Sequence, residues 1–163
     1  MLAKIYKSDA GYTAEYEHNY EVPSERVWSS LVSNENYRFW MEHLEITDLS
    51  KGGNINFHFN DGSGTIEKIT ITDYMEGKVL QFEWGEDTVR FEIIPAYTSS
   101  RLIMKQFLTK LTDHTPKDLA GWHVCLQKFD DVVTGESHFL PEDEWEKWYA
   151  EYKLLVNNLN HAD

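Results

Sequence analysis

The sequence predicts an α+β domain in which a curved antiparallel sheet of about six to seven strands wraps around one long helix. Residues 12–111 alternate between apolar and polar side chains, and turn residues divide them into short segments. Residues 115–135 follow, with apolar side chains at helical spacing. The 163 residues contain no linker or repeat, so we expect a single domain over residues 1–163 with a sizeable core.

The charge balance excludes several function classes. Fifteen Lys and Arg against 28 Asp and Glu give a net charge of −13, which repels nucleic acid and anionic membrane surfaces. A single cysteine, Cys125, allows no intrachain disulfide. The sequence contains no run of about 18 apolar residues and no apolar leader, so we expect a cytoplasmic protein that does not enter a membrane.

The first predicted strand, residues 12–22, is followed directly by two short helices. Pro23 ends the strand and suits a first helical turn, and Val27 and Leu31 share one face of the helix. Ser33 or Asn34 can cap the second helix. The apolar face of the second helix is predicted to comprise Tyr37, Trp40, Met41 and Leu44.

Turn residues divide the following sheet region into strands. Gly52-Gly53 and Asp61-Gly62 indicate hairpins, and further turns are expected at residues 76–78 and 85–87. Between these turns apolar and polar residues alternate. The change of parity after Ile66 predicts a bulge near Glu67-Lys68. The last strand should run from Arg101 to about Leu111.

The long helix has clear start and stop signals. Thr115 can cap it, Pro116 suits its first position, and Gly135 suits its C-terminal end. One apolar stripe includes Leu119 and Val133, while His123 is predicted to face away from it. A final amphipathic helix is expected to begin near Pro141 and to pack on the outside of the fold.

Three segments together resemble one known family. Residues 22–28 (VPSERVW), continuing to Phe39-Trp40, resemble the N-terminal signature of the START-like superfamily, also called SRPBCC. More specifically, they are similar to proteins related to the C-terminal domain of the activator of Hsp90 ATPase. Residues 78–84 (KVLQFEW) resemble a strand of that family, and Ala120-Gly121-Trp122 resembles the start of its long helix.

This resemblance implies the helix-grip fold and a cavity or groove between sheet and long helix. Many members of the superfamily bind lipids, sterols, polyketides or other apolar molecules. The resemblance therefore implies a small apolar ligand, with a chaperone of the Hsp90 type as an alternative partner. It implies no cofactor. An isologous dimer is compatible with the sequence, as is a monomer.

The usual signatures of catalysis or metal binding are absent from the sequence. Seven histidines are spread along the chain without a metal-ligand spacing. Residues 61–64 (DGSG) resemble a phosphate-binding loop in composition, but they join two strands and predict a hairpin turn. Cys125 lies on the apolar stripe and is interpreted as a buried side chain.

A few polar residues on inward-facing strand positions are candidate ligand contacts. His18 shares a face with Tyr16 and Tyr20, where it could bind a ligand, act as an acid or base, or be a satisfied core histidine. Tyr20 itself is a second polar candidate. Gln106, which shares parity with Leu102 and Met104, is the third.

These residues support three functional hypotheses. The first is a non-enzymatic binder of a hydrophobic molecule, the second a protein-interaction module that regulates a chaperone, and the third a cyclase- or aromatase-like enzyme with His18 as acid or base. For the first, the predicted lining residues are Trp40, Phe57, Phe82, Trp84, Phe91, Met104, Trp122, Leu126 and Phe129.

Gly121 raises a question about the long helix. A glycine inside a helix costs about 1 kcal/mol relative to alanine. Close packing of the sheet against this turn would explain the residue, and so would space for a ligand beside Trp122.

Overall fold

The fold is built on an eight-stranded antiparallel sheet with the strand order β1-β2-β8-β7-β6-β5-β4-β3. The computed structural model describes residues 1–9 and 11–160. Neighbouring strands are joined mostly by short turns, as predicted. The strands are β1 (Lys4–Ser8), β2 (Gly11–Tyr20), β3 (Leu44–Asp48), β4 (Asn54–His58), β5 (Ile66–Met75), β6 (Val79–Trp84), β7 (Asp87–Pro95) and β8 (Ser100–Leu108).

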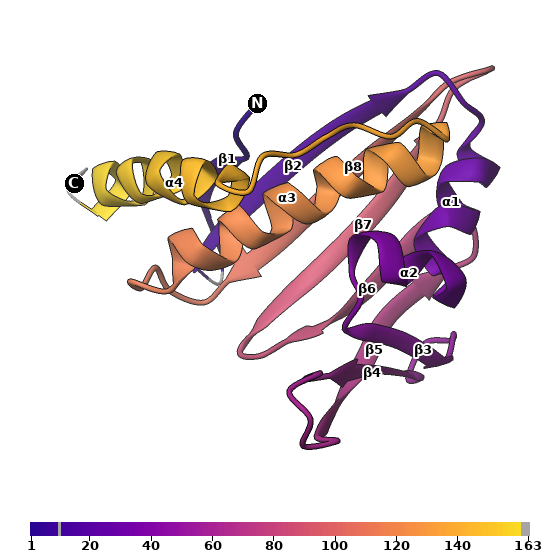
Figure 1. Ribbon diagram of the computed structural model, residues 1–163, viewed down its shortest axis with the longest axis horizontal. Coiled ribbons are helices and arrows are strands. Elements are labelled where there is room, and N and C mark those ends of the chain that lie inside the picture. Colours follow the sequence, from indigo (N-terminus) through magenta and orange to yellow (C-terminus); the bar gives the residue numbers. More distant parts are fainter. Residues whose placement is uncertain (10, 161–163) are drawn as a thin grey trace.

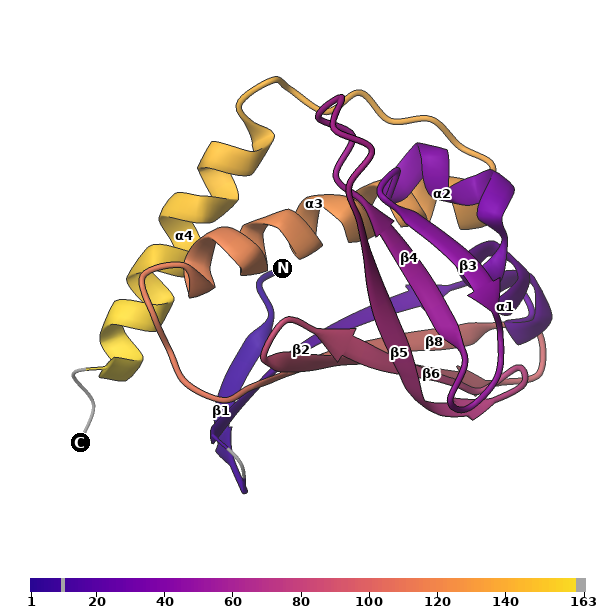
Figure 2. The same ribbon diagram turned by 90° about the horizontal axis from the view of Figure 1, so that it is seen from below.

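The described residues also form four helices, and the long one lies in the hollow of the sheet. They are α1 (Ser24–Val32), α2 (Asn34–Trp40), α3 (Thr115–Thr134) and α4 (Glu144–Asn160). Figure 1 shows α3 crossing one face of the sheet, with α1 and α2 at one end and α4 at the other. In Figure 2 the sheet curls upward through β5, β4 and β3 beside α3. The predicted helix-grip fold is confirmed.

Both edge strands, β1 and β3, were missing from the sequence prediction. Only Ile5 of β1 is even partly buried among its five residues, so the sequence carries no apolar alternation there. In the second short helix the Met41 backbone N–H bonds the Tyr37 carbonyl oxygen at 2.7 Å, and the helix ends at Trp40. Leu44, predicted as part of that helix, instead begins β3. An apolar residue at position 44 fits both a helix and a strand, because the Leu44 side chain would be buried in either one.

The predicted bulge lies in a different place. Pairing of β4 with β5 runs without interruption through Glu67 and Lys68, and the irregularity occurs in the β5–β6 pairing between Ile71 and Asp73. Ile66 is exposed near the β4–β5 turn, so its parity carried no information about the core face. The prediction near Glu67-Lys68 was therefore wrong.

The ends of α3 differ from prediction only at the start. His114, not Thr115, is the residue before the first helical turn, and the Thr115 hydroxyl accepts a 2.9 Å hydrogen bond from the Thr112 backbone N–H. Thr115 thus stabilises the incoming turn. At the other end Gly135 adopts the left-handed conformation, with φ 77°, and its N–H bonds the Asp131 carbonyl oxygen, as expected for a glycine cap.

Helix α4 packs against the side of α3 that carries His123. His123, predicted to face away from the apolar stripe, does so but is buried against α4. Its Nδ1 lies 2.7 Å from the Tyr152 hydroxyl oxygen, and its ring centroid lies 3.9 Å from that of Trp148. Within the described ranges, none of the helices has the length and apolar character required to cross a bilayer.

Gly121 lies on a part of α3 that nothing covers closely. A Cβ atom placed there would meet no heavy atom within 4 Å, apart from the local helix. Close packing of the sheet therefore does not explain this glycine.

Replacement of Gly121 by alanine should stabilise the protein. We expect Gly121→Ala to raise the free energy of unfolding by about 1 kcal/mol, because alanine has less backbone entropy to lose in a helix. Gly135→Ala is the matched control and should lower it by roughly 1–2 kcal/mol, because L residues are strained at its positive φ. Urea denaturation measures both. A destabilising Gly121→Ala would show that the site beside Gly121 requires the missing side chain.

Candidate functional site

A cleft of about 290 Å³ opens where β6, β7 and β8 meet the first turn of α3. Trp84 and Leu108 provide apolar surface in it. Most of the other lining side chains are polar or charged, and they include Glu86, Asp87, Lys110 and Asp118. A cleft that combines an apolar wall with a few polar groups is the common form of a small-molecule site.

The side-chain amide of Gln106 connects the two aspartates of this cleft. Its Nε2 donates to Asp118 Oδ2 at 2.6 Å and more weakly to Asp87 Oδ2 at 3.5 Å. Asp118 Oδ1 also accepts a bond from the Trp84 indole N–H at 3.3 Å. Asp87 Oδ1 accepts a bond from the Thr109 backbone N–H at 3.1 Å. The two carboxylates are therefore held in fixed positions.

Asp87 is the member of this group whose carboxyl group has a raised pKa. Partial burial raises the pKa of its carboxyl group, and the negative charge of Asp118 raises it further. Hydrogen bonds from Thr109 and Gln106 act in the opposite direction without cancelling the rise. An additional positive charge in the cleft would relieve this repulsion.

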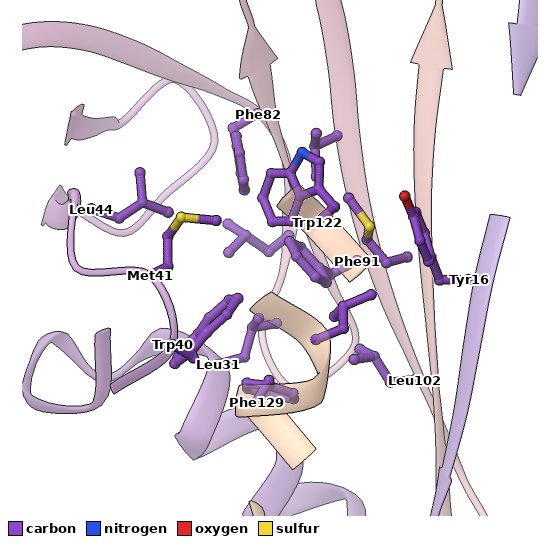
Figure 3. Close-up of a cluster of buried hydrophobic side chains, with 14 of the residues drawn as sticks. Tyr16, Leu31, Trp40, Met41, Leu44, Phe82, Phe91, Leu102, Trp122 and Phe129 are labelled. Atoms are coloured by element: carbon purple, nitrogen blue, oxygen red, sulfur yellow. The ribbon is translucent and has the colours of Figure 1, made fainter. Parts of the chain in front are cut away.

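Two buried polar atoms belong to residues that contact lining residues of the cleft but do not line it themselves, and these atoms have no hydrogen-bond partner in the described part of the chain. They are Gln106 Oε1 and Trp122 Nε1, and both side chains are almost fully buried. The Trp122 ring centroid lies 5.0 Å from that of Trp84. Figure 3 shows the indole nitrogen of Trp122 on the side of the ring away from Phe129. A buried polar atom without a partner lowers the stability of the folded state.

The predicted lining residues come together between the sheet and α3, where most of them pack against one another (Figure 3). Trp40 lies 4.8 Å from Phe129 between ring centroids, and Phe91 lies 6.0 Å from Trp122. Of the nine, only Phe57 and Trp84 are partly exposed, and Trp84 lies in the described cleft. The fully buried members of the set are Trp40, Phe82, Phe91, Met104, Trp122, Leu126 and Phe129.

The polar candidates separate into two groups at opposite ends of α3. Gln106 joins the cleft at Asp118, whereas His18 and Tyr20 meet Asp130, which is 12 residues further along α3 and so about 18 Å away. His18 Nδ1 lies 2.8 and 2.9 Å from the two carboxylate oxygens of Asp130. The Tyr20 hydroxyl donates to Asp130 at 2.6 Å.

Burial raises the pKa of Tyr20, and the adjacent Asp130 carboxylate raises it further, so Tyr20 remains a neutral donor. If His18 donates from Nδ1 to Asp130, its Nε2 is left as an acceptor. A cleft of about 330 Å³ adjoins this group and is lined in part by Tyr20 and Asp130.

A larger groove of about 580 Å³ lies on the outside of α2 and α3. It is lined by Phe39, Val132 and Leu140, together with polar residues that include Lys128 and Asp131. Phe39 is 56% exposed, which is unusual for a large aromatic side chain. This groove is a candidate surface for contact with another protein.

Other motifs of the sequence have local structural explanations. Residues 61–64 form the β4–β5 turn, where Asp61 Oδ1 accepts a bond from the Ser63 backbone N–H at 2.9 Å. Burial raises the pKa of the Cys125 thiol to about 11, so it stays protonated at neutral pH. Across residues 1–9 and 11–160, no three His, Cys, Asp or Glu side chains form a metal-binding group. His161 lies outside these ranges.

The sequence analysis missed three of the residues that define these sites. Asp87 falls in the turn predicted at residues 85–87, and Asp118 and Asp130 fall within the predicted long helix, where neither was singled out. Asp118 and Asp130 do lie in α3, whereas Asp87 is the first residue of β7. Packing of α3 across the strands brings Asp118 to Gln106 and Asp130 to His18, and pairing of β7 with β8 brings Asp87 near Gln106. No local sequence pattern reports these contacts.

Comparisons with known proteins identify a family and several similar folds. Residues 21–134 match the family model described as Activator of Hsp90 ATPase homolog 1-like protein. The comparison with curated proteins found no match.

Solved structures share the fold over nearly the whole chain. A conserved protein of unknown function from Enterococcus faecalis, EF2215, is 23% identical with a TM-score of 0.83, over 96% of this chain and 91% of that one. CalU16 from Micromonospora echinospora is 17% identical with a TM-score of 0.72, over 96% of each chain. The BPP1335 protein of Bordetella parapertussis is 20% identical with a TM-score of 0.72, over 91% of this chain and 87% of that one.

Proposed function

The chain belongs to the family of Activator of Hsp90 ATPase homolog 1-like proteins, and on this premise we propose that it binds a small, mainly apolar molecule without transforming it. The molecule would lie in the cleft at Trp84, with its polar end toward Asp118. The observation that carries this proposal is the combination, in one cleft, of the aromatic side chain of Trp84 with the carboxylate of Asp118, which the Gln106 amide holds in place. The predicted apolar set extends from Trp122 into the core, where a longer ligand would have to displace side chains.

A neutral amphiphile tests this proposal directly. We expect 4-phenylbutan-1-ol to bind with 1:1 stoichiometry, detected by saturation-transfer NMR, and to raise the melting temperature as its concentration increases. Native mass spectrometry of the gently purified protein should in addition detect any molecule retained from the cell.

Two variants locate the site. Trp84→Ala removes the aromatic wall and should weaken binding at least tenfold, whereas Phe39→Ala alters the separate outer groove and should leave binding unchanged. Loss of binding in Phe39→Ala, with binding retained in Trp84→Ala, would show that the ligand binds in the outer groove. Absence of both saturable binding and a retained molecule would refute the proposal.

A second candidate function is contact with a chaperone of the Hsp90 type. The family description and the exposed Phe39 beside the outer groove favour it. Phe39→Ala should weaken capture of purified Hsp90 by the immobilised protein, whereas Trp84→Ala should not. Equal capture by wild type and Phe39→Ala, or no capture with ATP, ADP or no nucleotide, would contradict this function.

An acid–base role for His18, as in a cyclase-like enzyme, has the contact with Asp130 as its support. Such a role requires His18 Nε2 to reach a bound substrate. Once a substrate is known, an unaltered reaction rate in His18→Ala would contradict this acid–base role.

A further inference from the structure

The segment that follows α3 forms the wall between two clefts on the outer side of that helix. Residues 136–140 are neither helix nor strand, and Figures 1 and 2 show the chain running back along α3 from its C-terminal end toward α4. We call these residues the strap. Glu136, His138 and Leu140 line both the cleft of about 330 Å³ at Asp130 and the outer groove of about 580 Å³. The strap therefore separates two spaces that would otherwise adjoin.

One residue of α3, Asp131, holds the strap through His138. Asp131 Oδ2 accepts a hydrogen bond from the His138 backbone N–H at 2.9 Å, and Asp131 Oδ1 lies 2.5 Å from His138 Nδ1. Within the described residues, the strap makes one other hydrogen bond to α3, from the Glu136 backbone N–H to the Thr134 hydroxyl at 3.3 Å, beside the helix end. The polar attachment of the strap to α3 therefore depends mainly on the contact between Asp131 and His138.

We propose that Asp131 and His138 form a latch that responds to pH, and that loss of either charge releases the strap and joins the two clefts into one groove along α3. With the carboxylate ionised and the imidazole protonated, the contact is a charge-assisted hydrogen bond, which is about twice as strong as a neutral one. A neutral imidazole can still donate from Nδ1. Deprotonation therefore shifts the strap toward its open position without abolishing the closed one.

The charges that face His138 come from α3 and from the strap, and they are mostly acidic. The hydrogen bond to Asp131 and the negative charge of Asp131 raise the pKa of His138 above the ordinary value of 6.5. Glu136 and Asp130 contribute smaller effects in the same direction. Glu136 Oε2 lies 3.3 Å from the second ring nitrogen, Nε2. One lysine, Lys128, lines the outer groove.

The other elements around the strap add little charge. Arg26 of α1 lies beside Gly135, where the strap begins. The residues that α2 and β2 contribute to the two clefts are uncharged at neutral pH, and they are Asn36, Phe39, Asn19 and Tyr20. The acidic groups of α3 and the strap therefore dominate the protonation of His138.

The sign of the pH dependence follows from the pKa shifts of the two residues. His138 is protonated more readily in the closed strap, so its contribution is complete below about pH 6.5 and is lost as the pH rises through its raised pKa. Removal from water raises the pKa of Asp131, but the hydrogen bonds from His138 outweigh this effect and hold the pKa below 3.8. The contribution of Asp131 is therefore complete above about pH 3.8. The strap should be most closed between these limits and should open progressively above them.

The exposure of the latch suits a reversible switch. The His138 side chain is 66% exposed, so it exchanges protons freely with solvent, and exposed ion pairs contribute little stability. A change of one charge can therefore shift the position of the strap. Opening would uncover more of Val132 and extend the apolar surface of the outer groove. The latch itself needs no partner, whereas its use in controlling a protein contact at the outer groove rests on the second proposed function.

Amide exchange in the full chain tests the latch. By NMR, the His138 backbone N–H should be protected at least threefold more strongly at pH 5.5 than at pH 8.5, after correction for the intrinsic exchange rate. The Gly135 N–H, which bonds the Asp131 backbone carbonyl oxygen at 2.9 Å, is the internal control and should show no such change. Relaxation of the Val132 methyl protons by the soluble nitroxide TEMPOL should rise at least twofold at pH 8.5, because the strap then covers them less.

Matched variants assign the pH dependence to this contact. His138→Gln keeps the backbone N–H and an uncharged side-chain donor. The amide at position 138 should therefore show, at both pH values, the low protection of the wild type at pH 8.5. Asp131→Asn removes the other charge and should give the same result. His58→Gln makes the matched change at another histidine that contacts a carboxylate, with Nε2 3.1 Å from Glu45 Oε1, and should keep the wild-type pH dependence. Circular dichroism confirms that each variant is folded.

The outcomes separate the latch from the function that would use it. Equal protection of the His138 N–H at the two pH values, or a pH dependence that persists in His138→Gln, overturns the latch. A pH dependence that is lost equally in His58→Gln also overturns it, because a general effect of charge would then be sufficient. If the His138 N–H loses protection while Val132 stays equally covered, the two clefts do not join. All of these results leave the Hsp90 contact standing, whereas failure of Hsp90 capture contradicts that contact and leaves the latch in place.

Discussion

Trp122→Ala is expected to lower the free energy of unfolding by about 3–5 kcal/mol, the usual cost of truncating a buried large aromatic side chain. Trp122 is only 2% exposed and lies at the centre of the layer between α3 and the sheet. Its ring packs against Trp84 at 5.0 Å and Phe91 at 6.0 Å between centroids. The cavity left by truncation would adjoin the cleft, so the loss includes contacts on both sides. Denaturation in guanidinium chloride, monitored by circular dichroism, measures it.

Phe139→Ala is the matched control for this prediction. Phe139 is also a large aromatic residue, but it is 88% exposed, so truncation should change stability by no more than about 0.5 kcal/mol. A loss below about 1 kcal/mol in Trp122→Ala would mean that the surroundings of the ring are not packed as described. A small loss of this kind would favour an interior that is already open to ligands.

A second substitution at the same position, Trp122→Phe, tests the indole N–H separately from the apolar ring. An unpartnered Trp122 Nε1 contributes nothing favourable to the folded state, and its burial without a hydrogen bond has a cost. Trp122→Phe removes that donor and keeps much of the apolar ring. We therefore expect Trp122→Phe to lose much less stability than Trp122→Ala. A larger loss in Trp122→Phe would show that the indole N–H has a partner in the folded protein.

Sequence periodicity was sufficient for the fold where one face of an element is buried and the other is not. The alternation in β2 and the stripe of α3 are examples, since Tyr16, Leu119 and Phe129 are buried as their positions required. Periodicity failed for β1, because a strand at the sheet edge exposes both of its faces. It also failed at Leu44, where burial is the same in a helix and in a strand.

The candidate site was predictable only in part, for a physical reason. Gln106 could be recognised as a polar residue at an inward position of a strand, and Trp84 and Trp122 as apolar residues that face the interior. The carboxylates that give the cleft its chemistry come from the first turn of α3 and from the first residue of β7. Charged residues are ordinary at both places, so Asp87 and Asp118 acquire meaning only when the tertiary structure brings them to Gln106.

Acid should destabilise the protein through His123, which α4 holds in its neutral form. Burial, together with the smaller effect of the positive N-terminal amino group, lowers the pKa of His123 to about 4 from an ordinary value of 6.5. The Tyr152 hydroxyl accepts a bond from the Ala3 N–H at 3.0 Å and can then donate its own proton to His123 Nδ1. A protonated ring could no longer accept this bond.

The direction of the pH dependence follows from the two pKa values of His123. Above about pH 6.5 the ring is neutral in both folded and unfolded chains, and it contributes no pH dependence. Between about pH 6.5 and pH 4 only the unfolded chain takes up the proton, so the free energy of unfolding falls as the pH falls. The full loss, reached below about pH 4, is at most about 3 kcal/mol.

Comparison of His123→Gln with wild type isolates this contribution from those of the carboxylates. The free energy of unfolding of both proteins is measured by urea denaturation from pH 7.5 to pH 4. As the pH falls, the wild type should lose more stability than the variant. His138→Gln is the control, because hydrogen bonding to Asp131 raises the pKa of His138 and protonation of that residue favours the folded state. Its difference from wild type should therefore change with the opposite sign.

A His123→Gln difference that is constant over this range would show that α4 does not hold His123 in its neutral form. Faster hydrogen exchange in α4 of the wild-type protein at pH 4.5 than at pH 7, after correction for the intrinsic rate, would locate the lost stability at the α3–α4 contact.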